Sequence, residues 1–381
     1  MAAGPFTNRQ RATALVVGFA ILAALAATIL ATTGSAKARP TCFGKPATIV
    51  GTNGNDKITT KLTAGKDIVA ARGGNDIIQA SSNVNNHGKD IVCGDDGNDR
   101  ITGNNEAEIL IGGPGKDDVK GGPGNDLIVG DNANPSGPES GPTALDELNG
   151  TGGNDFVVGD NYGKGNVSGA SADNDNKGLQ GLDGNDTVIG DDASLQGNAT
   201  GGKTDRVAGA DGNDLVIGDS YAPNGVASGS GDDDQDKKGG LNAGPGNDLL
   251  VGDNYTKTGR ATGGGEDTLA GADGGDFNEP CKPHTCDDVF YGDNFALSCV
   301  PNTTPAAQQS IAVIRCEAER APGGAPDRLT PDIGDDFMNG GDPDGDLRSA
   351  GDVCSGGKDK DTGTRCELYA KGDTEHQIAY P

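Results

Sequence analysis

Residues 112 to 129 read Gly-Gly-Pro-Gly-Lys-Asp-Asp-Val-Lys and then Gly-Gly-Pro-Gly-Asn-Asp-Leu-Ile-Val. They are two consecutive copies of one nine-residue unit. In each unit the glycines permit a tight turn with positive φ, and the apolar residue two positions after the sixth-position Asp begins a short strand. Because turn, carboxylate and strand recur at a fixed short period, the stretch predicts a parallel β-helix.

The unit extends towards the N-terminus from Gly112. The sixth-position acids are Asp56, Asp67, Asp76, Asp90, Asp99, Glu108, Asp117 and Asp126, at spacings of 11, 9, 14, 9, 9, 9 and 9. Two positions after each acid stands an apolar residue: Ile58, Val69, Ile78, Val92, Ile101, Leu110, Val119 and Ile128. The unit that contains Glu106 and Glu108 departs from the glycine pattern, so it is a poor candidate for a metal site.

A longer repeat follows residue 126. Its motif is Asn-Asp, then three residues that are apolar or Thr, then Gly-Asp. The Asp of the Asn-Asp pair is Asp126, Asp155, Asp186, Asp214 and, in outline, Asp248, at steps of 29, 31, 28 and 34 residues. Nine residues before the last four stand Asp146, Lys177, Asp205 and Gly239, each two positions before an apolar residue. The two-strand coil therefore continues, and each coil gains an insertion of about ten to sixteen residues on one face.

This arrangement predicts two ladders of acids, about 4.7 to 4.9 Å apart at the backbone. The tight edge carries Asp126, Asp155, Asp186, Asp214, Asp248 and Asp276, and the loop edge carries Asp131, Asp160, Asp191, Asp219, Asp253 and Asp293. Ionised carboxylates this close repel one another, and calcium held between them by six to eight oxygen ligands removes the repulsion.

The repeat G-G-x-G-x-D-x-U-x resembles that of the RTX (repeats-in-toxin, haemolysin-type) family of secreted calcium-binding proteins, from about Gly51 to Asp361. The resemblance implies an all-β fold, a right-handed parallel β-roll or β-helix (a solenoid) with inserted loops along one edge. It also implies calcium held between coils eighteen residues apart, which pairs Asp99 with Asp117 and Asp126 with Glu108. The candidate calcium ligands are Asp56, Asp76, Asp99, Asp117, Asp126, Asp131, Asp155, Asp160, Asp186, Asp191, Asp214, Asp219, Asp248, Asp253, Asp276 and Asp293.

The composition favours a fold that is conditional on cations. The chain has 381 residues with 66 Gly, no Trp, 33% hydrophobic residues and a net charge of -27. Low hydrophobicity with high charge is typical of disorder, whereas a stacked repeat needs only one short apolar row per coil. We expect a chain that is loose without divalent cations and folded with them. So acidic a chain is a poor partner for nucleic acid or anionic membranes.

The N-terminal segment is typical of a secretory signal. Arg9 and Arg11 precede an apolar run from Ala12 to Ile29, and Ala36-Lys37-Ala38 is a small-x-small cleavage site. We predict cleavage after Ala38, secretion and no membrane span afterwards, with an uncleaved anchor as the alternative. The expected segments are 1–38 (signal peptide), 39–50 (lead-in), 51–131 (compact β-roll), 132–294 (β-roll with one-sided loops) and 295–381 (irregular repeats and a disulfide-stapled cap).

The eight cysteines all follow this segment, which favours disulfides. Only local pairs are offered, Cys281 with Cys286, Cys299 with Cys316 and Cys354 with Cys366, because eight cysteines allow about 105 connectivities. Cys281, His284 and Cys286 also permit a fragment of a zinc site, for which no fourth ligand is evident.

An enzyme is the main alternative function. Gly218-Asp219-Ser220-Tyr221 resembles the nucleophile block of SGNH (GDS-type) esterases, and the segment from Asp373 to His376 fits their C-terminal block. However, Ser220 occupies the repeat position of Asn132 and Asn254. We therefore predict no enzymatic domain and a structural or adhesive role, with the inserted loops contacting a cell-surface or other extracellular partner. A secretion or folding module for a partner protein is the remaining alternative.

Overall fold

The computed structural model describes residues 39–59, 66–80, 88–169, 178–233, 240–265 and 267–270, and beyond them only short strands between residues 289 and 369. The chain divides into two units, Met1–Pro40 and Thr41–Pro381, and the fold described below is that of the second. The described residues contain strands and no helix, so none of them forms a helix long and apolar enough to cross a membrane. The fold is all-β.

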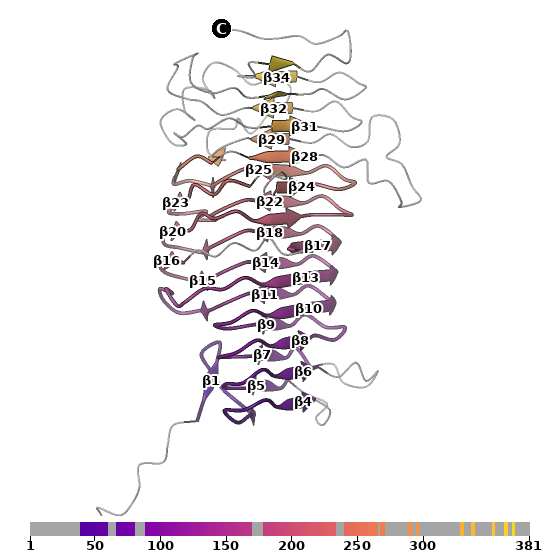
Figure 1. The fold of residues 1–381 in the computed structure, drawn as a ribbon, viewed down its shortest axis with the longest axis vertical. Helices are drawn as coiled ribbons and strands as arrows, with labels where there is room; N and C mark the ends of the chain where they lie inside the picture. Colours follow the sequence, from indigo (N-terminus) through magenta and orange to yellow (C-terminus); the bar gives the residue numbers. More distant parts are fainter. Residues whose placement is uncertain are drawn as a thin grey trace, which may run out of the picture. The chain divides into compact units, whose positions relative to one another are not determined.

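Two parallel sheets of twelve strands each form the main body of this unit (Figure 1). Sheet 1 contains β4 (Lys57–Thr59), β6 (Ile77–Gln79), β8 (Arg100–Thr102), β10 (Asp118–Pro123), β13 (Glu147–Gly152), β17 (Leu179–Asp183), β21 (Arg206–Ala208), β24 (Gly240–Asn242), β28 (Thr268–Ala270), β31 (Arg328–Thr330), β33 (Val353–Cys354) and β35 (Leu368–Tyr369). Sheet 2 contains β3 (Ile49–Val50), β5 (Ile68–Ala70), β7 (Ile91–Cys93), β9 (Ile109–Ile111), β11 (Leu127–Val129), β14 (Phe156–Val158), β18 (Thr187–Ile189), β22 (Leu215–Ile217), β25 (Leu249–Val251), β29 (Val289–Tyr291), β32 (Phe337–Asn339) and β34 (Thr362–Thr364).

The chain alternates between these sheets, so one sheet 1 strand and the next sheet 2 strand make one layer. The spacing of paired residues follows the sequence repeat. Val119 pairs with Ile101 eighteen residues earlier, and with Leu148 after the first insertion. In every layer the chain runs in the same direction along a given sheet, so neighbouring strands of that sheet are parallel.

A single row of apolar side chains from each sheet fills the space between the two sheets. The row from sheet 1 is Ile78, Ile101, Val119, Leu148, Leu179, Val207, Leu241 and Leu269. The row from sheet 2 is Val69, Val92, Leu110, Ile128, Val157, Val188, Val216 and Leu250. All of them are essentially inaccessible to solvent, which confirms the predicted core positions two residues after the repeat acids. So narrow a core needs no large aromatic side chains.

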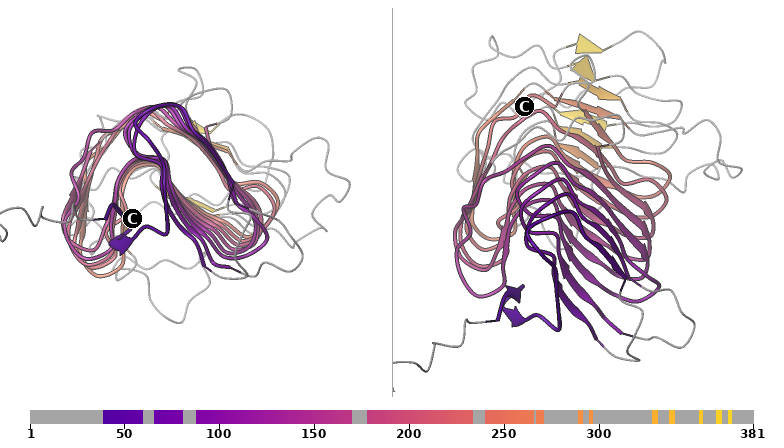
Figure 2. Two further views of the ribbon diagram at one scale, coloured as in Figure 1. Left: turned by 90° about the horizontal axis from the view of Figure 1, so that it is seen from below. Right: turned by 60° about the horizontal axis from the view of Figure 1, so that its bottom comes forward.

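The inserted segments line up on one side, as expected, but the expectation that they are loops is wrong. They form a third sheet of β12 (Ala133–Asn134), β15 (Tyr162–Gly163) and β19 (Ala193–Ser194), and a two-stranded sheet of β26 (Tyr255–Thr256) and β30 (Phe295–Ala296). A fourth sheet contains β16 (Val167–Ser168), β20 (Ala199–Thr200), β23 (Val226–Ser228) and β27 (Arg260–Thr262). We call the part made by these strands the second lobe, and Figure 2 (left) shows it beside the main body. Equivalent insertions pair with one another across layers, which local sequence does not reveal.

The second lobe covers part of the outer face of sheet 2. Side chains on that face, such as Val158, Ile189 and Ile217, share one apolar cluster with Tyr162 and Tyr255. The ring of Tyr255 also stacks on that of Tyr221, with centroids 5.3 Å apart. Among the residues whose side chains the structure describes, the aromatic rings are thus concentrated where the lobe meets the main body.

A disulfide bond fixes an N-terminal hairpin to the first layers. The hairpin consists of β1 (Thr41–Cys42) and β2 (Lys45–Pro46), and Cys42 is bonded to Cys93 at the end of β7. Neither cysteine belongs to a pair predicted from the sequence. The side chains of its three proposed pairs, Cys281 with Cys286, Cys299 with Cys316 and Cys354 with Cys366, lie outside the part of the chain that the structure describes.

Candidate metal centre

Buried carboxylates occur at the same position in most layers. The first column stands at the start of the sheet 1 strands and contains Asp56, Asp76, Asp99, Asp117, Asp146, Asp205, Asp233 and Asp267. In this column the layer of β17 has Lys177 at this position of the sequence. The second column precedes the sheet 2 strands and contains Asp67, Asp90, Glu108, Asp126, Asp155, Asp186, Asp214 and Asp248. Apart from Asp56, all of these side chains are buried.

Most of these carboxylates accept a main-chain N–H of the neighbouring layer. In the first column the N–H of Asp99 donates to Oδ1 of Asp117 at 2.6 Å. In the second column the N–H of Glu108 donates to Oδ1 of Asp126 at 2.7 Å, and that of Asp126 to Oδ1 of Asp155 at 2.8 Å. The two pairs implied by the resemblance, Asp99 with Asp117 and Asp126 with Glu108, are therefore neighbours in the structure.

The second oxygen of many of these carboxylates has no hydrogen-bond partner. This is so for Oδ2 of Asp76, Asp99, Asp117, Asp126, Asp155 and Asp186, and for Oε1 of Glu108, and all seven atoms are buried. Leaving a buried acceptor without a donor costs about 1–3 kcal/mol, and more for a charged group. Each of these layers therefore contains an oxygen that requires a proton or a cation.

Burial raises the pKa values of these groups against the opposing effect of the main-chain N–H donors. The pKa of Asp117 rises to about 9 and that of Asp99 to about 7. In the second column burial raises the pKa of Glu108 to about 8, with the Asp126 carboxylate adding to the effect. It raises the pKa of Asp155 to about 7. Neutralisation of these carboxylates is thus favoured by the fold itself.

Glycine leaves the space into which the second oxygen points. A Cβ on Gly112 would collide with Asp117 Oδ2 and with the carbonyl oxygen of Gly130 in the next layer. A Cβ on Gly150 would likewise collide with Asp155 Oδ2 and with the carbonyl oxygen of Gly181. Beside each such glycine, therefore, a carboxylate oxygen lies near a main-chain oxygen of the adjacent layer, and neither of these two atoms can donate a hydrogen bond to the other.

A third column of carboxylates lies at the neck, where the chain leaves sheet 2 for the second lobe. It contains Asp131, Asp160, Asp191, Asp219 and Asp253, all inaccessible to solvent. Their main chains pair in register, with N–H to O distances of 3.1 Å from Asp131 to Asp160 and 2.9 Å from Asp219 to Asp253. Where the chain returns from the second lobe to sheet 1, the acids of the first column lie near those of the third column. Burial raises the pKa of Asp191 well above its ordinary value, and the carboxylate of Asp205 adds to the effect.

The candidate metal ligands at these positions are all oxygen atoms. Among the described residues, no three Asp, Glu, His or Cys side chains converge closely enough to hold a metal ion by themselves. An ion at a repeat turn would therefore take one or two carboxylates and complete its coordination with glycine carbonyls and water. Oxygen ligands in an irregular arrangement suit Ca²⁺, whereas Zn²⁺ prefers nitrogen and sulfur. The residues present fit a calcium ion.

No family model and no curated protein matches this chain.

The structure brings most of the predicted ligands together in the expected ladders. Asp126, Asp155, Asp186, Asp214 and Asp248 follow one another through N–H to Oδ1 contacts of 2.7–2.8 Å. Asp276 and Asp293 lie outside the described residues. Asp276 was expected to follow Asp248, but β29 continues sheet 2 with Val289 beside Leu249. The residue of the sequence that corresponds to Asp248 is therefore the one before Val289, and not Asp276.

Asp233 and Asp267, two members of the first column, were not recognised as repeat positions from the sequence, and Asp146 and Asp205, which were, are not among the candidate ligands. Asp233 lies between Asp205 and Asp267, accepting the N–H of Asp205 at 2.5 Å and donating its own N–H to Asp267 at 3.0 Å. The nine-residue spacing gave Gly239 for this layer, because residues 234–239 separate Asp233 from β24. Asp267 was identifiable in the sequence, since it stands two positions before the core residue Leu269.

Ser220 is part of the interior of the second lobe. It is inaccessible to solvent, and its Oγ accepts the N–H of Gly201 at 2.8 Å. His376, its proposed partner in a hydrolase, lies outside the described residues. A nucleophile must reach its substrate, and Ser220 is enclosed.

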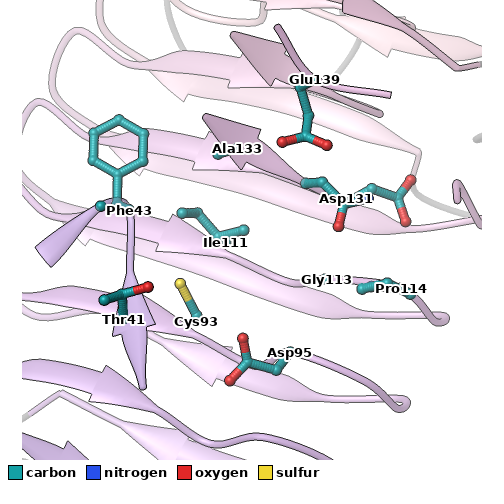
Figure 3. Close-up of a pocket in the computed structure, with 12 residues that line it drawn as sticks. Thr41, Phe43, Cys93, Asp95, Ile111, Gly113, Pro114, Asp131, Ala133 and Glu139 are labelled. Atoms are coloured by element: carbon teal, nitrogen blue, oxygen red, sulfur yellow. The ribbon is translucent and has the colours of Figure 1, made fainter. Parts of the chain in front are cut away.

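A cavity of about 200 Å³ opens beside the N-terminal hairpin (Figure 3). Phe43 and Thr41 of the hairpin line one part of it, and Asp95, Asp131 and Glu139 contribute carboxylates. Asp131 is the first member of the third column, so the cavity adjoins the end of that column. Burial raises the pKa of Asp95 to about 6.

Proposed function

We propose that this chain is a calcium-stabilised right-handed parallel β-roll of the RTX type, secreted, with a structural or adhesive role and no enzymatic domain. One observation carries the proposal. In layer after layer a buried carboxylate accepts one main-chain N–H with Oδ1 and leaves Oδ2 without a donor, facing a glycine and a carbonyl oxygen of the next layer. A row of divalent cations would satisfy all of these oxygens.

The repetition of the arrangement favours calcium over protons. Protonation would satisfy one oxygen in each layer, whereas a cation between layers draws together oxygens of two layers and offsets the net charge of -27. The ligands of Ca²⁺ are typically six to eight oxygens at variable angles, which suits turns that are similar but not identical. Extracellular modules bind calcium with dissociation constants on the order of 10⁻⁴ to 10⁻³ M.

Calcium would act as a folding cofactor. Its binding free energy becomes folding free energy when the site does not exist in the unfolded chain. A chain exported through the predicted signal peptide, with cleavage after Ala38, would then fold on meeting extracellular calcium. An uncleaved N-terminal anchor is compatible with the same calcium chemistry.

The second lobe is the proposed contact surface for a cell-surface or extracellular partner. Its fourth sheet buries Val167, Ala199 and Ala227 and turns Ser168 and Thr200 outwards. A rigid sheet of this kind presents side chains at fixed spacing to a partner. Replacing Ser168, Thr200 and Arg260 together by Glu should abolish attachment to the partner surface without lowering the melting temperature, and undiminished attachment would remove this part of the proposal.

Circular dichroism with and without calcium is the direct test of calcium-coupled folding. In chelator the whole chain should have a weaker strand signal and a lower melting temperature, and both should increase on titration with Ca²⁺. Asp117→Asn should raise the calcium concentration at the midpoint, because it removes a ligand charge while keeping the acceptor for the Asp99 N–H. Asp211→Asn, at an exposed turn position, is the matched control and should leave the midpoint unchanged. A spectrum rich in strand in chelator and insensitive to calcium would contradict the proposal.

A further inference from the structure

A fourth column runs through the second lobe, one residue after the third. Its members are Asn132, Asn161, Asp192, Ser220 and Asn254. They lie inside the lobe, between the third and fourth sheets, and four of the five are buried. Asp192 is the one member that carries a charge.

The uncharged members of later layers donate to main-chain oxygens across the lobe. Asn161 Nδ2 lies 3.2 Å from the carbonyl oxygen of Ser168 in its own layer and 3.4 Å from that of Gly141 in the preceding layer. Asn254 Nδ2 repeats this arrangement at 3.3 Å from Thr262 and 3.2 Å from Gly229.

The hydroxyl group of Ser220 occupies the same place. Its Oγ lies 3.5 Å from the carbonyl oxygen of Ser228 and 3.4 Å from that of Gly201. A hydroxyl has one hydrogen, so Ser220 donates to one of these two carbonyls at a time, and its Oγ also accepts the N–H of Gly201 at 2.8 Å. At this position, then, Asn161 and Asn254 supply two hydrogens to main-chain carbonyls, and Ser220 supplies one.

Asp192 has no hydrogen to supply when it is ionised. Its Oδ1 accepts the N–H of Asn161 at 3.1 Å, and its Oδ2 is buried with no hydrogen-bond partner. Strand β20 pairs with β16 in register, Ser168 beside Thr200, so the two carbonyls that correspond to those around Asn161 are those of Thr200 and Gly169. By this equivalence the Asp192 carboxylate, which the Gly169 N–H also approaches, stands where Asn161 and Asn254 place an amide group between two carbonyl oxygens.

We propose that Asp192 binds a calcium ion inside the second lobe, together with the carbonyl oxygens of Thr200 and Gly169. The ion takes the place of the amide hydrogens of Asn161 and Asn254 and links two layers of the lobe. This site lies outside the glycine-rich repeat turns, and it rests on the proposed function only for the identity of the cation.

The surrounding charges agree with a cation at this point. Burial raises the pKa of Asp192 to about 9, and the carboxylate of Asp160 adds to the rise against the main-chain N–H groups of Asn161 and Gly169. Asp191, the adjacent third-column residue, also has a buried oxygen, Oδ1, without a hydrogen-bond partner. The carboxylates of Asp160, Asp191 and Asp192 are thus near enough to raise one another's pKa values. No Lys or Arg is buried among the described residues.

The test is a count of bound calcium ions in the whole chain and in Asp192→Asn, by equilibrium dialysis followed by elemental analysis. Asn is the residue of three other layers, so the substitution removes a charge without changing the shape of the side chain. The variant should bind one calcium ion fewer than the parent chain. It should also melt at a higher temperature than the parent in chelator and gain less on addition of calcium, because the introduced amide would donate to both carbonyls.

Two further variants complete the test. Asp192→Ser, which introduces the residue of the next layer, should give the same loss of one ion and serves if the Asn variant folds poorly. Asn161→Asp places a second carboxylate in the column and should lower the melting temperature in chelator more than in calcium. An unchanged number of ions in both Asp192 variants, in a chain that still binds calcium, would overturn this inference alone and assign a proton to Asp192. A parent chain that binds no calcium would overturn the proposed function as well.

Discussion

The main-chain N–H of Asp99 donates to Oδ1 of Asp117 at 2.6 Å, while Oδ2 of the same carboxylate is buried with no hydrogen-bond partner. Each layer thus positions a carboxylate with the backbone of its neighbour and leaves one oxygen to be satisfied from elsewhere. The same relationship recurs from Glu108 to Asp126 and from Asp155 to Asp186. The stability of the fold should therefore depend on protons and cations.

The pH dependence of stability should have opposite signs in chelator and in calcium. The folded pKa values of Asp99, at about 7, and Asp117, at about 9, lie above the ordinary value of 3.8. A raised folded pKa stabilises the protein below the unfolded pKa, and this stability is lost as pH rises through the folded pKa. In chelator the free energy of unfolding should fall between about pH 4 and pH 9. In calcium it should rise over this range, because the ion binds the ionised carboxylate.

Urea unfolding at pH 5 and pH 8, in chelator and in calcium, measures all four values. A chelated protein that is equally stable at both pH values would show that the buried carboxylates do not control the stability of the fold. The matched control is Asp211→Asn, which should leave both slopes unchanged because Asp211 is exposed.

Gly112→Ala should destabilise the chain by about 1–3 kcal/mol, the usual range for overpacking. The added Cβ would collide with Asp117 Oδ2 and with the Gly130 carbonyl oxygen, so calcium affinity should fall as well. Gly152→Ala is the control, because the nearest atom to its added Cβ is the Asp183 Cβ at 3.9 Å. Thermal unfolding and calcium titration of the two variants check the prediction, and equal behaviour of both would contradict it.

Ala210→Gly should stabilise the chain by about 1 kcal/mol. Ala210 has a φ of 75°, and this left-handed conformation costs an L-residue roughly 1–2 kcal/mol that glycine avoids. Ala208→Gly, in the regular strand β21, should instead destabilise by about 0.5–1 kcal/mol because glycine loses more backbone entropy on folding. Opposite shifts in melting temperature are expected for the two substitutions. A decrease for Ala210→Gly would show that strain at this turn is not significant.

Replacing both Cys42 and Cys93 by Ser should lower stability by about 2–5 kcal/mol, since the bond closes a loop of 51 residues. The hairpin also contacts the second lobe through the rings of Phe43 and Tyr162, with centroids 6.2 Å apart. Phe43→Ala, which keeps the disulfide, should have a smaller effect. Thermal unfolding under oxidising and reducing conditions gives both numbers, and an oxidised protein no more stable than the double variant would refute the prediction.

Much of the main body was predictable because its determinants are local. The repeat unit of Gly112 to Val129 fixes a turn, a carboxylate and a core residue within nine positions, and Val119 and Ile128 are buried where the unit places them. The same spacing failed at Gly239, because a short segment separates Asp233 from its strand. The disulfide of Cys42 was not predictable, since nothing near the hairpin in sequence indicates its distance from residue 93.

The sequence by itself determined which residues form the layers and which acids form the ladders, because glycine turns, acids and apolar residues at a fixed period act over a few neighbouring positions. Only the tertiary structure decided that the insertions are strands, that Asp192 stands where other layers place a donor, and which carboxylate oxygen lacks a partner. The second-lobe strands are two or three residues long and have no periodicity of their own. They exist because each pairs with an equivalent strand one layer away, and that register is set by the stacking of the main body.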